Sequence, residues 1–219
     1  MKKEINLIFD FDSTLIQLET IEVLAEFSLK NNPNKKNIYN NIEKMTEQAM
    51  AGDLSFSDAL LKRILLLEIK KSHTILAIEY LKNKLSLSII KNQYFINKHK
   101  NNCYIISGGF KEIIWPIVKP INFIKENIYA NNFIYNNNIL SIDSHNPLSK
   151  DRGKNIVASK LKGYNIIIGD GYTDYEVKKY GNANIFIQFI ENINRKKLNK
   201  NADFIASDFK KIIEFINNV

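Results

Sequence analysis

Three short, mostly apolar runs stand out along the chain, and each is followed by polar or glycine-rich residues. They cover residues 4–9, 104–106 and 165–168. Continuous runs of this length that end in turn residues are typical of strands buried inside a parallel sheet. Helical patterns separate the runs, so the sequence predicts an α/β fold with an open, mostly parallel sheet. Ligands of such sheets bind beyond the carboxyl ends of the strands, which is where these polar residues stand.

A long stretch with little strand character separates the first two runs. Residues 20–70 show helical patterns, interrupted by the polar segment 31–37, which we expect to form a loop. We interpret this stretch as a helical cap inserted into the sheet domain. The expected division is a catalytic core formed by residues 1–15 and 75–219, with a cap formed by residues 16–74.

Two patterns predict local irregularities in the second half of the chain. Residues 133–135 and 139–142 flank three asparagines, Asn136 to Asn138, which predicts a β-hairpin with a three-residue turn. Pro116 falls inside the helix expected after Gly109. A proline at such a position kinks a helix or ends it early.

Composition places the chain among ordinary globular proteins. It has 219 residues, of which 45% are hydrophobic and 25% charged. No run of about 18 apolar residues occurs, so we expect no membrane span and no membrane partner. The first residues lead into a strand rather than a signal peptide, which favours the cytoplasm. The single cysteine, Cys103, excludes an internal disulfide framework and lies in an apolar run, where we expect it to be buried.

The net charge of +8 raises the possibility of a nucleic-acid partner. The lysines are scattered along the chain among asparagine and isoleucine, whereas a nucleic-acid footprint gathers on one face or helix. We therefore expect no nucleic acid partner, and binding to generic DNA remains the alternative that charge alone suggests.

The residues after the first run supply two carboxylates, Asp10 and Asp12, at a strand end. If the extended geometry continues, both point to the same side. One carboxylate could attack phosphorus while the other transfers protons, because covalent and acid-base roles need separate groups at one reacting centre. On its own, this pattern is also compatible with an acidic loop that caps a helix.

Three further groups lie near predicted strand ends or helix starts. Ser107 with Gly108 and Gly109 could form a turn or a phosphate cradle of hydroxyl and backbone amides. Lys154 precedes a helical pattern, although a surface lysine is common in such a chain. The third group, Gly-Asp-Gly-x-x-Asp, places Asp170 and Asp174 at a strand end, where carboxylate oxygens suit magnesium or simply cap a helix.

Taken together and in this order, these residues resemble the four motifs of the haloacid dehalogenase superfamily, from Asp10 to Asp174. The resemblance implies a Rossmann-like parallel sheet with helices on both faces and an inserted helical cap. It also implies a phosphatase that works through an aspartyl-phosphate. By that resemblance Asp10 is the nucleophile and Asp12 the general acid-base, while Ser107 and Gly108 hold phosphate oxygens. Such chemistry depends mainly on in-line placement and charge stabilisation.

The same resemblance assigns the remaining groups of the site. Lys154 neutralises the charge on the aspartate and the phosphate. Mg²⁺ is bound by Asp10, the Asp12 carbonyl and Asp170, while Asp174 orients Lys154 or a metal-bound water. Gly109 and Thr173 are expected beside the substrate.

Within the superfamily, the cap region is similar to that of the phosphoserine phosphatase family. Glu19 stands where that family places a carboxylate for the substrate ammonium group, and Arg63 where an arginine takes the substrate carboxylate. Met50 and Phe56 stand where the family walls its pocket. The resemblance implies hydrolysis of phosphoserine in the last step of serine biosynthesis, by a monomer or homodimer. Each of the four residues is individually compatible with a solvated helix face or with core packing.

Some alternatives stay open at the level of sequence. A related phosphatase could act on another small phosphomonoester, although Glu19 and Arg63 argue against it. A binding or regulatory protein could keep the fold without turnover, although the full set of motif residues argues against it. Asn132 departs from the family, which commonly has an arginine at that position.

Overall fold

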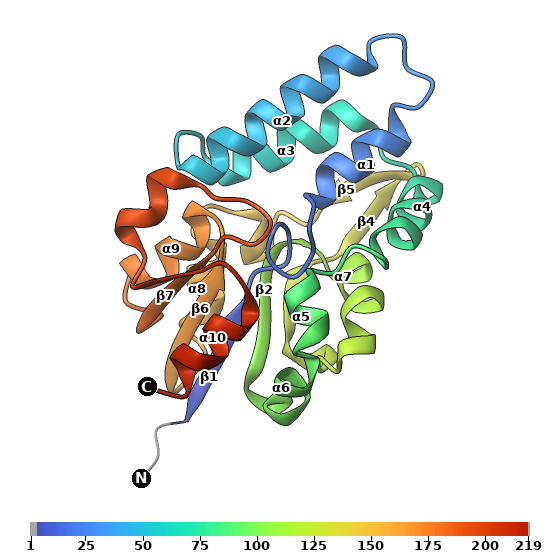
Figure 1. The fold of residues 1–219 in the computed structure, drawn as a ribbon. Helices are drawn as coiled ribbons and strands as arrows, with labels where there is room; N and C mark the ends of the chain where they lie inside the picture. Colours follow the sequence, from blue (N-terminus) through green and yellow to red (C-terminus); the bar gives the residue numbers. More distant parts are fainter. Residues whose placement is uncertain (1–3, 219) are drawn as a thin grey trace.

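The computed structural model describes residues 4–218 and contains a six-stranded parallel sheet (Figure 1). The order of its strands is β3-β2-β1-β6-β7-β8, and each neighbouring pair is parallel. The strands are β1 (Ile5–Phe9), β2 (Cys103–Phe110), β3 (Ile128–Asn131), β6 (Tyr164–Gly169), β7 (Ile185–Phe189) and β8 (Phe204–Ala206). The three predicted strands are therefore confirmed as the adjacent strands β2, β1 and β6. The chain winds away from β1 in both directions, which creates a switch point between β1 and β6.

Helices cover both faces of this sheet because its strands are apolar on both sides. Leu7 and Phe9 of β1 belong to a large core cluster on one face, whereas Ile8 belongs to a second cluster on the other. The first face is covered by α5 (Leu87–Lys91), α6 (Gln93–Lys98), α7 (Lys111–Val118) and α10 (Phe209–Ile216), and the second by α8 (Gly153–Ala158) and α9 (Tyr172–Lys179). The expected α/β fold with helices on both faces is confirmed.

Four helices follow β1 and include the stretch predicted as a cap. They are α1 (Thr20–Ser28), α2 (Lys35–Ala51), α3 (Phe56–Leu67) and α4 (Lys71–Leu81). Figure 1 shows α1, α2 and α3 above the carboxyl end of the sheet. The predicted boundary at residue 74 falls within α4, so the division of the chain into core and cap stays a prediction.

The loop predicted over residues 31–37 is too long. Helix α2 already begins at Lys35, within the polar segment. Its first turns keep their polar side chains outward, while Ile38 and Ile42 pack into the core. An amphipathic helix of this kind tolerates a polar start, because only one face has to be apolar.

The hairpin is confirmed, but its predicted three-residue turn is wrong. It consists of β4 (Phe133–Asn136) and β5 (Ile139–Ile142), and Asn136 pairs with Ile139. Only Asn137 and Asn138 form the turn, with φ values of 50° and 64°. Two consecutive positive φ angles match the twist of a two-residue hairpin, and asparagine tolerates this conformation.

Helix α7 carries Pro116 in its last turns and ends two residues later at Val118. The helix thus continues past the proline and is followed directly by the 3-10 helix η2 (Lys119–Ile121), so the kink or early end predicted from Pro116 stays a prediction. No helix among residues 4–218 is long and apolar enough to cross a membrane.

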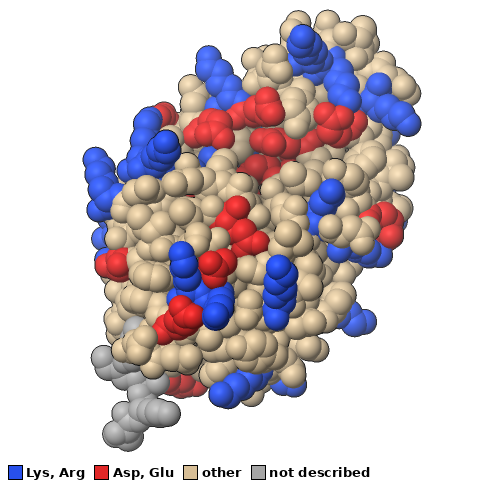
Figure 2. All heavy atoms as spheres, in the orientation of Figure 1, with Lys and Arg blue, Asp and Glu red and all other residues tan. Residues whose placement is uncertain are grey.

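The surface drawn in Figure 2 shows how charge is distributed on one face. Lys and Arg side chains are spread around this face, whereas Asp and Glu side chains gather across its middle and upper parts. The net charge of +8 therefore does not form a continuous basic surface on the side shown.

Candidate active site

Asp10 and Asp170 directly follow β1 and β6, so they flank the switch point of the sheet. Lys154, from the first turn of α8, places its amine between the carboxylates of Asp10 and Asp174. Its Nζ is 2.8 Å from Asp10 Oδ1 and 2.8 Å from Asp174 Oδ1. All four side chains are buried. Burial opposes the lysine's charge, but the two carboxylates outweigh it and raise the pKa of Lys154.

Asp10 is oriented by the backbone and by Lys154. The Phe11 amide donates to Asp10 Oδ1 over 2.7 Å, and Lys154 contacts the same oxygen. No hydrogen bond within residues 4–218 involves the other oxygen, Oδ2. The side chain is thus held in one orientation through Oδ1.

Asp12 lies in the same cavity as Asp10 and has the environment of a proton donor. Its Oδ1 accepts hydrogen bonds from the Thr20 amide, at 2.8 Å, and from the Thr20 hydroxyl. Burial, and to a lesser degree repulsion from Asp10, raises the pKa of Asp12 to about 7. A carboxyl group with this pKa can both give and take a proton near neutral pH.

The candidate phosphate cradle lies at the end of β2 rather than at a helix start. The strand continues to Phe110 with an irregular register after Ile106, and α7 begins only at Lys111. The Gly109 amide donates to Ser107 Oγ over 3.0 Å. A Cβ on Gly108 would lie 2.2 Å from Phe56 Cζ, so only glycine allows this close approach of the cap.

Thr173 and Asn131 complete the surroundings of the cradle. The Thr173 hydroxyl is buried beside the cavity and has no hydrogen-bond partner within residues 4–218, so it can bind a ligand. Asn131 was not predicted by sequence reasoning, which considered its neighbour Asn132. Its Nδ2 donates to Gly108 O, at 2.9 Å, and to Leu148 O, at 3.2 Å. This side chain fixes the backbone of the cradle.

The acidic residues can hold a hard cation. One oxygen each of Asp10, Asp170 and Asp174 lie within 4.8 Å of one another, and all three residues are buried. Burial raises the pKa of Asp170, and it raises that of Asp174 to about 8, which shows how costly these charges are without a cation. This geometric group includes Asp174 but not Asp12. The assignment of ligands therefore stays a prediction.

The predicted residues of core and cap line one small cavity of about 40 Å³. The cavity is also lined by Thr20, Ile21 and Leu60, to which the sequence analysis assigned no role. Asp170 and Asp174 do not line the cavity but lie next to Asp10 and Lys154, which do. The predicted residues that line the cavity are Asp10, Asp12, Glu19, Met50, Phe56, Arg63, Ser107, Gly108, Gly109, Lys154 and Thr173.

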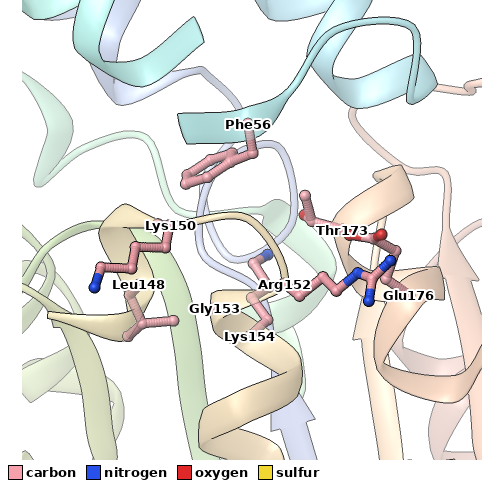
Figure 3. A pocket seen from close by; sticks show the side chains of 9 residues that line it. Phe56, Leu148, Lys150, Arg152, Gly153, Lys154, Thr173 and Glu176 are labelled. Carbon is pink, nitrogen blue, oxygen red and sulfur yellow. The ribbon is translucent and has the colours of Figure 1, made fainter. Parts of the chain in front are cut away.

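Figure 3 shows part of this arrangement in a neighbouring pocket, with Phe56 projecting from the cap above Lys154 and Thr173 of the core. On the other side of the cavity, Met50 at the end of α2 packs against Gly171, where an added Cβ would lie 2.7 Å from its sulfur. The two apolar side chains therefore close the cavity against the core.

Glu19 and Arg63 place opposite charges in the cap half of the cavity. Glu19 Oε1 accepts from Ser13 Oγ, at 2.6 Å, and from Arg195, at 3.2 Å, whereas Oε2 has no hydrogen bond within residues 4–218. Burial, with repulsion from Asp12 and Asp170, raises the pKa of Glu19 to about 8. A cationic ligand would favour its charged form.

Arg63 is 3% exposed and is anchored within the cap. Its Nε donates to Ala59 O, at 3.0 Å, and its Nη1 to Thr46 Oγ1, at 2.9 Å. No hydrogen bond from Nη2 occurs within the described part of the chain. Burial lowers the pKa of Arg63, so an anionic ligand would relieve an unfavourable charge.

Arg195 is a site residue that sequence reasoning missed. Its Nε donates to Asp170 Oδ2 over 2.7 Å, and its other nitrogens contact Glu19, at 3.2 Å, and Glu47, at 3.1 Å. It lies in the segment after β7, outside the four motifs. A lone arginine in a lysine-rich segment carries no signal that separates it from its surface neighbours.

A parallel sheet with paired carboxylates and a buried lysine at its switch point, and a glycine-rich segment at the end of the neighbouring strand, has the features of a hydrolase site of the haloacid dehalogenase type. In agreement, the profile of the haloacid dehalogenase-like hydrolase family matches residues 7–178. The chain belongs to this family.

Within this family, the chain is similar to proteins named phosphoserine phosphatase. It is 29% identical over 216 residues to the chloroplastic phosphoserine phosphatase of Arabidopsis thaliana, covering 95% of this chain and 70% of the relative. It is 28% identical over 212 residues to the phosphoserine phosphatase of Homo sapiens, covering 94% and 90%. The phosphoserine phosphatase of Methanocaldococcus jannaschii is 27% identical, covering 98% and 99%.

Solved structures agree with this result. A phosphoserine phosphohydrolase-like protein from Francisella tularensis is 32% identical, with a TM-score of 0.86, covering 96% of this chain and 99% of that protein. A substrate-bound phosphoserine phosphatase is 23% identical, with a TM-score of 0.77, covering 98% and 99%. The latter similarity confirms the fold alone.

Proposed function

We propose that this protein is a magnesium-dependent phosphoserine phosphatase that hydrolyses O-phospho-L-serine to L-serine and phosphate. The observation that carries the proposal is the single small cavity that Glu19 and Arg63 share with Asp10 and Ser107. Phosphoserine carries an ammonium group, a carboxylate and a phosphate, and the cavity offers a matching group for each. The phosphoserine phosphatases among its relatives support the same assignment.

In the first half of the reaction, Asp10 Oδ2 attacks phosphorus and forms an acyl phosphate. The bond between phosphorus and the serine oxygen breaks, and Asp12 gives its proton to that oxygen. The raised pKa of Asp12, about 7, suits this donation. Lys154 contacts Asp10 at 2.8 Å and offsets the charge that gathers on the phosphoryl oxygens.

In the second half, water attacks the phosphorus of the acyl phosphate. Asp12, now a carboxylate, takes a proton from this water, and the bond between phosphorus and Asp10 breaks to release inorganic phosphate. Ser107, the Gly108 amide and Thr173 hold the phosphoryl oxygens in both halves. The unpartnered Thr173 hydroxyl supports this role.

A magnesium ion fits the carboxylate oxygens that meet below the cavity, because it prefers hard oxygen ligands. Asp10 and Asp170, with the Asp12 carbonyl, would hold it, and Asp174 would position Lys154. When bound, the ion supplies positive charge against the phosphate oxygens.

In the cap, Glu19 Oε2 binds the substrate ammonium group and Arg63 Nη2 binds its carboxylate. Arg195 supports both halves of the site, because it contacts Asp170 in the core and Glu19 at the start of the cap. The reaction produces serine, which is consistent with the last step of serine biosynthesis.

The test is phosphate release from O-phospho-L-serine and from a panel of other small phosphomonoesters, with magnesium and with excess chelator. We expect phosphoserine to have the highest kcat/KM, chelation to abolish turnover, and Asp10→Asn to be inactive while remaining folded by circular dichroism. A preference for a sugar phosphate would replace phosphoserine as the substrate. Full activity of Asp10→Asn would exclude the proposed nucleophile.

A further inference from the structure

The loop before Lys154 forms hydrogen bonds with the cap. Asp151, in the core, accepts a hydrogen bond from the Ser57 amide of α3 over 2.9 Å, and from Ser55 Oγ over 2.9 and 3.0 Å to its two oxygens. These residues are more than 90 positions apart in the sequence. Figure 3 shows this loop, marked by Lys150 and Arg152, beneath the end of α3 that carries Phe56.

The contact gives a backbone amide in the first turn of α3, that of Ser57, a hydrogen-bond acceptor. The first amides of a helix have no partner inside the helix, and an N-cap side chain or a nearby anion normally stabilises them. The N-cap of α3, Ser55, accepts from the Asp58 amide only over a long 3.3 Å. Asp151 therefore acts as a second, charged cap that comes from another part of the chain.

Both ends of this contact lead directly to the active site. Helix α3 begins with Phe56, whose ring touches Gly108, and continues to Arg63. On the core side, Asp151 lies three residues before Lys154, and the intervening backbone is tightly fixed. Gly153 has no room for a Cβ, which would lie 2.1 Å from Pro147 O.

We propose that Asp151 is a positioning residue that latches the cap in its closed position, by capping α3 from the loop that carries Lys154. The inference deepens the proposed function, on which it rests, since it concerns closure of the same cavity. The contact exists only when α3 sits on the core, so it stabilises the closed arrangement selectively. It does not touch the substrate, so it acts alike on all substrates of this site.

Hydrogen bonding to the charged form of Asp151 supports this interpretation. Asp151 is an exposed residue, and its slight burial alone would raise the pKa of the carboxyl group, but the Ser57 amide and the Ser55 hydroxyl lower it below its usual value. The group is therefore fully ionised near neutral pH and presents a negative charge to the start of α3.

The chain offers a matched control at the same boundary. Lys197 of the core and Asp53 of the cap form an ion pair at 2.9 Å, with side chains that are 73% and 56% exposed. Exposed pairs of this kind contribute little, and this one caps no helix. Lys197→Gln therefore removes a contact between the two parts without removing the latch.

The kinetic test compares Asp151→Ala, Asp151→Asn and Lys197→Gln on phosphoserine and on a phosphomonoester without amino-acid groups. For Asp151→Ala we expect kcat/KM to fall roughly 3- to 30-fold on both substrates, mainly through KM, because a cap is lost. Asp151→Asn keeps an acceptor without the charge, so its loss should be about 2- to 5-fold. Lys197→Gln should stay within about twofold of the wild type.

The second readout is amide hydrogen exchange of the peptide that covers residues 54–60, measured without substrate. Exchange should be faster in both Asp151 variants than in the wild type and Lys197→Gln, whereas the helices of the sheet domain should exchange at unchanged rates. Unchanged exchange, or kcat/KM within twofold in Asp151→Ala, would overturn the latch. If no phosphomonoester is hydrolysed, the proposed function fails, while hydrogen exchange still decides whether the latch exists.

Discussion

In the proposed complex, Glu19 binds the ammonium group of the substrate and Arg63 binds its carboxylate. Each residue can therefore be tested with a substrate that lacks the group it binds. Arg63→Ala should cost roughly 2 to 5 kcal/mol in kcat/KM for phosphoserine, the range for breaking a buried charged pair. The loss should be much smaller for phosphoethanolamine, which has the ammonium group but no carboxylate. Glu19→Gln should spare phosphoglycolate, which has a carboxylate but no ammonium group.

The informative quantity is the ratio of kcat/KM values between substrates for each variant. Arg63 also donates to Ala59 O and Thr46 Oγ1, so its removal disturbs the cap as well as the cavity. Equal losses on all substrates would mean that the two residues only hold the cap together. In that case the phosphoserine assignment would fall, while a phosphatase built on Asp10 and Lys154 would survive.

Single residues also show why the sequence could predict only part of the site. Asp10 and Asp170 follow apolar strands, Ser107 follows the apolar run within β2, and all three belong to spaced motifs, which separates them from other polar residues. Arg195 has no such context, although it contacts Asp170 and Glu19 directly. Asp151 also lacks a sequence motif. Its partners lie more than 90 residues away in the sequence, and they contact it only because α3 packs on the core. Contacts that arise from tertiary packing leave no local pattern.

At the scale of elements, the predicted strands were those with continuous apolar runs. Strands β3 and β8 have only four and three residues, and β7 contains a buried glutamine, so each gives a weak local signal. The hairpin was found from its asparagines, but its register depended on which of them adopt positive φ. Tertiary context decides this, because all three asparagines have the same local preference.

The short connection between η4 (Pro147–Ser149) and α8 gives a prediction at this scale. Gly153 begins α8 against the backbone of Pro147 and Leu148, and a Cβ there would lie 2.1 Å from Pro147 O. Gly153→Ala should therefore shift the start of α8, cost about 1 to 3 kcal/mol of unfolding free energy and lower kcat by displacing Lys154. Chemical denaturation and steady-state kinetics measure the two effects.

Gly181 provides the control for this substitution. It has a positive φ of 80° but no atom within 4 Å of an added Cβ. Gly181→Ala should cost about 1 to 2 kcal/mol through backbone conformation alone and leave kcat unchanged. If both variants kept the kcat of the wild type, close packing at Gly153 would not be what positions Lys154.

For the whole molecule, the active site concentrates buried carboxylates in a protein whose net charge is +8. Lys154 and Arg195 offset part of this negative charge, yet the pKa of Asp12 is raised to about 7 and those of Glu19 and Asp174 to about 8. Burial is the largest cause in each case. The folded protein without a cation therefore binds more protons than the unfolded chain between about pH 4 and pH 8.

This difference in proton binding fixes the sign of the pH dependence. Because the folded state binds the extra protons, the unfolding free energy of the metal-free protein should fall as the pH rises from 6 to 8. Asp151 does not alter the trend, because an aspartate with a lowered pKa in the folded state and an ordinary pKa in the unfolded chain is ionised in both states across this range. Magnesium should stabilise the protein more at pH 8 than at pH 6, because burial raises the pKa of its proposed ligand Asp170, and the ion competes with protons for that carboxylate more strongly at the lower pH. Denaturant titrations in excess chelator and in magnesium, at both pH values, measure all four stabilities, and Asp12→Asn should flatten the metal-free slope. A metal-free protein that does not lose stability from pH 6 to pH 8 would show that these carboxylates are already ionised in the folded state, and that the buried lysine and arginine suffice to hold them.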